Sequence, residues 1–193
     1  MELRLTKLSE VKNHKPFTNF LNTSLFPFWQ TLKNHIFTTI SQLKISLNET
    51  LPLAERTLSQ SDVGFHNILG EEKSNRLIFI DFEYFGWDDP VKMMCDFILQ
   101  PAMPLPTQYH PIFIEKMLES LPYRDKLGQR FKLIFPLLGF KWCLIMLNPF
   151  LPERRQKLGK DEDILLKQRL QKSKEKLLTI VQYHQTQEFT QWV

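Results

Sequence analysis

Cysteine is scarce in this sequence, with only Cys95 and Cys143 among 193 residues. Each lies inside an apolar, helix-like pattern, and their separation matches no metal-binding motif. We expect both to be buried, reduced thiols that pack as small apolar side chains. The lack of a disulfide framework favours a cytoplasmic protein over a secreted one.

Long uninterrupted hydrophobic runs are also missing. The first residues, "MELRLTKLSEVKNHK", contain neither the apolar stretch nor the small-residue cleavage site of a secretory signal. The longest apolar run, "FKLIFPLLGFKWCLIML", is interrupted by Lys132, Pro136 and Lys141, and it is shorter than the roughly 20 apolar residues of a membrane span. The sequence therefore predicts no membrane span, and we expect this run to be a core helix that bends at Pro136.

Positive charge exceeds negative charge in a single segment only. The formal net charge is +4, and the segment from Leu151 to Lys176 contains nine Lys or Arg and five Asp or Glu, so it accounts for the whole excess. Aromatic residues that would stack on bases are missing from this segment. A solvated helix face is the commoner explanation, and no nucleic-acid partner is expected.

Aromatic residues, by contrast, are plentiful, with 16 Phe and 4 Trp. An apolar share of 42% indicates a folded chain, and the length fits a single domain of residues 1–193. Apolar spacings of three and four predict helices over about 28–46, 109–120, 125–147 and 161–184. The expected fold class is α+β and mostly α-helical, with a small central β-hairpin.

The expected hairpin consists of "NIL", a polar turn "GEEKSN" and the apolar strand "RLIFIDF". We expect the second strand to be buried, with Asp81 at its end. A carboxylate in that place is either held by hydrogen bonds or used in chemistry. The loop "EYFGWDDP" follows, and Asp88 or Asp89 is suited to cap a helix that starts at Pro90.

The loop "SDVGFHNIL" before the hairpin concentrates three polar side chains, Asp62, His66 and Asn67. Alone, it fits an ordinary turn in which Gly64 supplies a positive φ. Together with Asp81 it forms a pattern used for phosphoryl transfer. In that pattern one carboxylate receives or orients the proton of the attacking hydroxyl, while an amide oxygen and a second carboxylate hold Mg²⁺.

These two segments resemble the catalytic loop and the metal-binding strand of the aminoglycoside phosphotransferase and choline kinase family. The resemblance covers roughly Leu53 to Arg155 and implies a protein-kinase-like C-terminal lobe that uses ATP and Mg²⁺. It implies that Asp62 is the catalytic base and that Asn67 and Asp81 are magnesium ligands. It further implies that Asp96 braces the catalytic loop, and that His66 either makes a structural hydrogen bond or contacts phosphate.

Two departures from the family accompany this resemblance. Gln60 stands where the family usually has His, and we expect Gln60 to make the same backbone contacts. The residues before Asp62 contain no glycine, and they offer no lysine in a strand pattern that would grip the phosphates. The N-terminal nucleotide lobe is therefore expected to be absent or much reduced, so that another polypeptide supplies it or the exposed face self-associates.

The acceptor is expected to be a small molecule with a hydroxyl group. Glu83, Asp88 and Asp89 are candidates for attracting a cationic, amine-bearing or sugar-like acceptor, although capping is the commoner role for Asp88 and Asp89. Whether the chain is an enzyme is left open by the missing lobe. The alternative is a noncatalytic kinase-like remnant that serves as a binding or interaction module.

Overall fold

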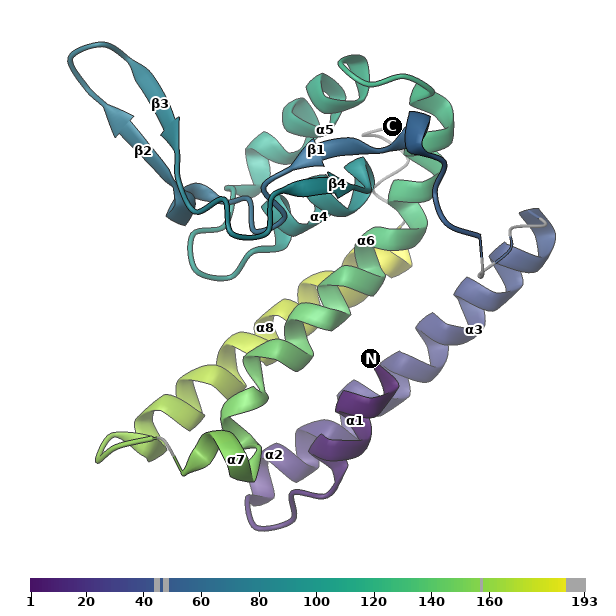
Figure 1. Cartoon of the computed structure of the whole chain (residues 1–193). Coiled ribbons are helices and arrows are strands. Elements are labelled where there is room, and N and C mark those ends of the chain that lie inside the picture. Colours follow the sequence, from purple (N-terminus) through teal and green to yellow (C-terminus); the bar gives the residue numbers. More distant parts are fainter. Residues whose placement is uncertain (44–45, 47–48, 157, 187–193) are drawn as a thin grey trace. The chain divides into compact units, whose positions relative to one another are not determined.

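The computed structural model describes residues 1–43, 46, 49–156 and 158–186 of the chain. The fold is α+β and mostly helical, with two small antiparallel sheets (Figure 1). The described residues form two compact units. The first contains Met1–Ser46 and Gly139–Thr186, and the second contains the described residues between Ser46 and Gly139.

The first unit is helical. Its elements are α1 (Glu2–Ser9), α2 (Lys15–Phe20), a π-helical turn (Leu21–Leu25), α3 (Phe26–Leu43), the end of α6 (Arg124–Met146), a 3₁₀ turn (Asn148–Phe150), α7 (Pro152–Arg155) and α8 (Glu162–Thr186). Its core is aromatic: the rings of Phe17 and Phe150 stack with centroids 4.2 Å apart, and those of Trp29 and Phe140 stack at 5.1 Å. Stacked rings of this kind add to the free energy gained from burying their area.

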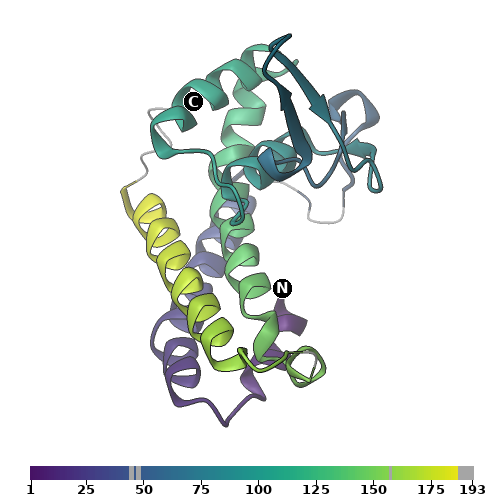
Figure 2. The same cartoon turned by 90° about the vertical axis from the view of Figure 1, so that its left-hand side faces the viewer.

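The second unit contains the sheets. Its elements are a 3₁₀ turn (Leu53–Glu55), β1 (Thr57–Ser59), a second 3₁₀ turn (Phe65–Asn67), β2 (Ile68–Glu71), β3 (Arg76–Phe79), β4 (Gly86–Asp88), α4 (Pro90–Leu99), a third 3₁₀ turn (Thr107–Tyr109), α5 (His110–Glu119) and the start of α6. Strand β1 pairs with β4, from Thr57 opposite Asp88 to Ser59 opposite Gly86. Strand β2 pairs with β3, and this hairpin extends away from β1, β4 and α4 (Figures 1 and 2).

The predicted helices are confirmed, with ends shifted by a few residues. Helix α3 begins two residues before the predicted start, and part of the predicted end, at residues 44 and 45, lies outside the described residues. Helix α6 contains Pro136, as expected. Strand β4 was not predicted, because its three residues were assigned to a loop.

Both cysteines are free and buried, as predicted. Burial raises the pKa of the Cys143 thiol to about 12, because the thiolate would lose its hydration inside the protein. Among the described residues one helical stretch, Arg124–Phe150, has the length and apolar composition to cross a membrane, and half of its most apolar window is buried in the protein. Core helices of folded proteins have the same composition.

The prediction of a buried second hairpin strand is wrong. Every residue from Glu71 to Ile80 is exposed, and Leu77 exposes 67% of its surface. The apolar run "LIFI" suggested burial, but β2 and β3 form a sheet of only two strands, which shields neither of its faces. Asp81 is likewise exposed, and its φ of 61° places it in the left-handed region.

Candidate functional site

The candidate site begins with a sharp turn after β1. Ser61 has a φ of 63°, its amide donates to Ser59 Oγ at 2.9 Å, and the Asp62 amide donates to the Gln60 carbonyl at 2.8 Å. These short-range bonds turn the chain back on itself. As a result the Asp62 side chain is half exposed, and its carboxylate is accessible to solvent and to a ligand.

Gly64 is needed for space and not for a positive φ. Its φ is 178°, an extended conformation that any residue adopts, so the predicted positive φ is wrong. A Cβ atom at this position would lie 2.6 Å from Nδ1 of His66, which is closer than any ordinary contact. The absence of a side chain at Gly64 therefore lets the His66 ring pack against the loop.

Asn67 connects the loop to both strands of the hairpin. Its side chain is buried, and its Nδ2 donates to the Asp62 carbonyl at 2.9 Å. Its own carbonyl accepts from the amide of Ile80 at 3.0 Å. In the described part of the chain no hydrogen bond engages Asn67 Oδ1. An amide oxygen of this kind is a suitable ligand for a hard cation.

Gln60 connects the same loop to Asp81. Its Nε2 donates to the Asp81 carbonyl at 3.0 Å, a backbone contact of the kind the sequence suggested for Gln60. The other side-chain atom, Oε1, is buried without a hydrogen-bond partner among the described residues. The bonds from Gln60 and Asn67 link the backbone at Asp81 and at Asp62 to this loop, and a site shared by the side chains of Asp62, Asn67 and Asp81 stays a prediction.

His66 lies between Asp62 and the end of α4. Gln100 Oε1 accepts from the amides of Ala102 and Met103, so its Nε2 is directed to His66 Nδ1 at 2.9 Å. A ring nitrogen that accepts a hydrogen bond carries no proton, so the proton of the neutral ring lies on Nε2. That nitrogen is 3.5 Å from Asp62 Oδ2. The His66 ring therefore lies beside the Asp62 carboxylate with its N–H on the nearer nitrogen, and its supporting role stays a prediction.

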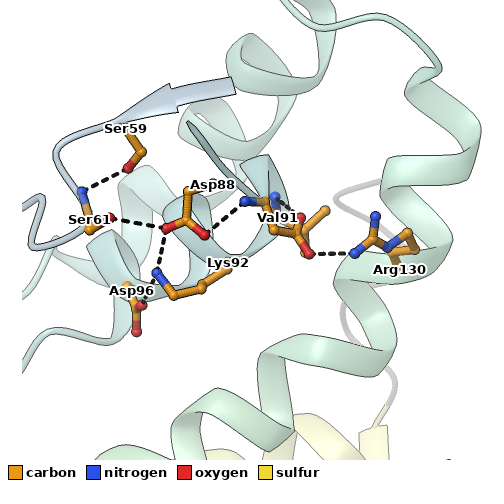
Figure 3. A network of polar contacts seen from close by, with 8 residues as sticks. Ser59, Ser61, Asp88, Val91, Lys92, Asp96 and Arg130 are labelled. Carbon is orange, nitrogen blue, oxygen red and sulfur yellow. Dashed lines mark hydrogen bonds and ion pairs between the residues drawn. The ribbon is translucent and has the colours of Figure 1, made fainter. Parts of the chain in front are cut away.

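A polar network joins α4 to the loop (Figure 3). Lys92 Nζ lies 2.6 Å from Asp88 Oδ2 and 3.5 Å from Asp96 Oδ2, and Ser61 Oγ donates to Asp88 Oδ2 at 3.3 Å. Burial alone would lower the pKa of Lys92, but the hydrogen bond to Asp88 and the charge of Asp96 raise it overall. The buried Asp96 thus connects to Ser61 of the loop through Lys92 and Asp88, and its bracing of a catalytic loop stays a prediction.

Asp89 has a structural role at the start of α4. It is the N-cap residue, and its Oδ1 accepts from the amide of Val91 at 2.9 Å, as the sequence suggested for Asp88 or Asp89. Its Oδ2 also forms an ion pair with Arg130 of α6. Glu83, by contrast, is exposed. A role in acceptor binding for Glu83, Asp88 and Asp89 stays a prediction.

Three partners of these residues were not predicted from the sequence: Gln100, Lys92 and Ser61. Gln100 follows α4 and lies far from the loop in sequence, so no local pattern indicates its bond to His66. Lys92 and Asp96 stand four residues apart in α4, and that spacing in a helix predicts contact, so it was a usable signal for this pair. Asp88 lies before the helix, in β4.

The site offers few protein ligands to a metal ion. In the described ranges no group of three or more His, Cys, Asp and Glu side chains is arranged to hold one. Asn67 and Asp81 would supply two oxygens, and Mg²⁺ commonly completes its shell with water and phosphate oxygens. The first unit has cavities of about 610 Å³ and 570 Å³, and none of the candidate residues lines either.

Comparisons with family models, with curated proteins and with solved structures find no match to this chain.

Proposed function

We propose that the second unit is the catalytic lobe of an ATP- and Mg²⁺-dependent phosphotransferase that acts on a hydroxyl group of a small molecule. One observation supports this proposal above the others: Gln60 and Asn67 donate side-chain hydrogen bonds to the backbone carbonyls of Asp81 and Asp62, so the backbone at both aspartates is linked to the same loop. Asp62, Asn67 and Asp81 are of the residue types required for phosphoryl transfer. Hydrogen bonds to the backbone fix the conformation of this part of the chain, which suits a site that works by positioning its reactants.

In this proposal each residue of the cluster has one task. The exposed Asp62 carboxylate accepts the proton of the acceptor hydroxyl as its oxygen attacks the terminal phosphorus of ATP, and ADP leaves with the electrons of the broken bond. Oδ1 of Asn67 and the Asp81 carboxylate would hold Mg²⁺, which would offset the negative charge of the phosphates. His66 orients the Asp62 carboxylate through its Nε2–H, and Gln100 fixes the His66 tautomer.

The nucleotide side of the site is incomplete in the described residues. Those before Asp62 form helices α1 to α3, a 3₁₀ turn and the short strand β1. None of these elements provides a glycine-rich strand pair to cover phosphates. We therefore propose that a second polypeptide supplies the nucleotide lobe, and that the isolated chain binds MgATP weakly and transfers phosphate negligibly.

The acceptor side is proposed to lie at the segment after Asp81. Glu83 is exposed there, and so are the aromatic residues Tyr84, Phe85 and Trp87, which expose between 51% and 64% of their surfaces. A carboxylate beside aromatic faces suits a cation or the apolar face of a sugar. The proposed acceptor is an amine-bearing or sugar-like molecule with a free hydroxyl group.

An alternative function has an observation of its own. The apolar hairpin is exposed, which favours a noncatalytic module that binds other polypeptides. In that case Asp62, Asn67 and Asp81 would be remnants without a nucleotide. Magnesium-dependent nucleotide binding distinguishes the two functions. Binding of a polypeptide to the apolar hairpin would not require magnesium.

Titration calorimetry of ATP into the purified chain, with and without Mg²⁺, tests the proposed function. We expect weak binding that requires Mg²⁺ and disappears in Asp81→Asn. Asparagine tolerates the positive φ at this position, so the variant removes charge without adding strain. Glu72→Ala, which removes an exposed acidic residue from the hairpin turn, is the matched control and should bind like the wild type. Equal binding by Asp81→Asn and wild type would refute the shared metal site.

A further inference from the structure

The β2–β3 hairpin exposes apolar side chains on both of its faces. In the observed register Ile68 is opposite Phe79 and Gly70 is opposite Leu77, so Ile68, Leu77 and Phe79 share one face. Leu69 is opposite Ile78 on the other face. The charged pair Glu71 and Arg76 lies at the turn, with Arg76 Nη2 2.8 Å from Glu71 Oε2. An isolated hairpin of two strands is marginally stable in water, so a partner that covers this one would stabilise it.

The outer edge of β3 is open to another strand. The Ile80 amide bonds to the Asn67 carbonyl, so these two residues form a hydrogen-bonded pair of the ladder. Such pairs alternate with non-bonded ones, and therefore Leu77 and Phe79 direct their N–H and C=O groups away from β2. This edge has no proline and no bulge, and its one charged residue, Arg76, is held by Glu71. The strand is short, at four residues, but it has no proline, bulge or lysine that would block strand addition.

Apolar side chains surround this edge. Eight residues in and next to the hairpin each expose between 37% and 67% of their surface: Leu69, Leu77, Ile78, Phe79, Ile80, Phe82, Tyr84 and Phe85. Pairing along β3 would cover the part of this surface that borders the edge on both faces of the hairpin. A contact of that limited size is suited to a reversible association.

We propose that a second copy of this chain pairs its β3 antiparallel with this β3, so that the two hairpins form one four-stranded sheet. The outward-directed groups define the register: Leu77 bonds to the partner's Phe79, and Phe79 bonds to the partner's Leu77. The twofold axis then passes beside Ile78, which faces the partner's Ile78. This contact is self-complementary, as a closed dimer requires.

The charges of the strand are compatible with this register. Arg76 lies opposite the partner's Ile80, four residues from the partner's Arg76. At about 3.4 Å per residue the two guanidinium groups start from backbone positions some 13 Å apart, beyond the Debye length in physiological salt. Each arginine also keeps its own Glu71. The pairing therefore buries apolar side chains without bringing like charges together, and it does not depend on phosphoryl transfer.

Sedimentation velocity of the purified chain at several concentrations tests the proposal. We expect a reversible dimer, and we expect Ile78→Lys to raise its dissociation constant by about 100-fold, because two ammonium groups then face each other at the axis. Leu69→Lys is the matched control: it places the same charge on the same face, but on β2, and should leave the dimer intact. Circular dichroism of each variant checks that the fold is retained.

Leu77→Pro provides a second variant with a different mechanism. The Leu77 N–H is directed away from β2, so proline there preserves the hairpin and removes a hydrogen bond of the dimer. We expect this variant to be monomeric. A wild-type chain that stays monomeric at all concentrations, a chain that forms assemblies larger than a dimer, or an Ile78→Lys dimer as tight as the wild type would overturn the proposal. If the chain is monomeric and a different polypeptide binds to it at the β3 edge, the second copy is not the occupant of that edge.

Discussion

The packing of the loop around Gly64 requires that this residue has no Cβ atom. The His66 ring occupies the space that a Cβ would need, and this ring is held by Gln100 on one side and lies near Asp62 on the other. A side chain at Gly64 would move the ring and with it the N–H directed at the carboxylate. The glycine is thus linked to the orientation of the proposed catalytic base, although it contacts no ligand.

We predict that Gly64→Ala lowers the free energy of unfolding by about 1–3 kcal/mol, the usual cost of inserting a methyl group into a packed position. In a His66→Ala background the same substitution should lower the free energy of unfolding much less, because the ring that blocks the added methyl group is gone. Gly70→Ala is the control, since nothing lies within 4 Å of a Cβ there. Urea denaturation measures the four variants. Equal costs of Gly64→Ala in both backgrounds would contradict the assigned contact.

Candidate residues were proposed where chemistry limits the choice. Asp62, Asn67 and Asp81 were singled out because few residue types serve a proton acceptor and a magnesium site. Hydrogen bonds link the backbone carbonyls of Asp62 and Asp81 to Asn67 and Gln60, and the roles of the three side chains stay predictions. The role of Gly64 was not predictable, since glycine is compatible with both a left-handed φ and a close contact. Only the three-dimensional position of the His66 ring distinguishes these two explanations.

At the scale of elements, α4 carries the supports of the loop. Its N-cap residue is Asp89, which also forms an ion pair with Arg130 of α6. Its first turns place Lys92 and Asp96 beside Asp88. The helix is therefore fastened at its start to α6 and along its side to the loop that contains Asp62 (Figure 3).

Two substitutions at Asp89 separate the cap from the ion pair. Asparagine still accepts the Val91 amide, so Asp89→Asn should lose only the charge and cost about 1 kcal/mol, as for a partly exposed ion pair. Asp89→Ala loses both interactions and should cost about 2–3 kcal/mol, because losing a cap adds about 1 kcal/mol. Chemical denaturation at neutral pH measures both. Identical losses would mean that the cap contributes nothing.

The long helices were predictable from the periodicity of their apolar residues, whereas the exposure of the hairpin strand β3 was not. Helices α3, α5, α6 and α8 were predicted because their apolar spacing repeats over several turns. Strand β4 has three residues, too few for a period, and it is a strand because β1 pairs with it. The strand β3 was expected to be buried because its sequence is apolar. Burial is a property of what surrounds a strand, and its surroundings lie outside the local sequence.

At the scale of the whole molecule, the second unit contains a polar cluster and an exposed apolar hairpin that share residues. Asn67 and Ile80 bond to each other where the hairpin leaves the loop. A polypeptide that covers the hairpin would therefore approach the cluster as well.

Asn67 and Asp81 are proposed to hold a divalent cation together with a nucleotide, and nuclear magnetic resonance with Mn²⁺ as the probe measures this binding at the level of single residues. Bound Mn²⁺ broadens the signals of nearby amides, so it locates even a weak site. We predict that Mn²⁺ with ATP broadens the amides of Asp62, Asn67 and Asp81 before any others. We also predict that Asp81→Asn removes this effect while Glu72→Ala keeps it. Broadening that is spread over acidic surface residues, or that is unchanged in Asp81→Asn, would contradict the account.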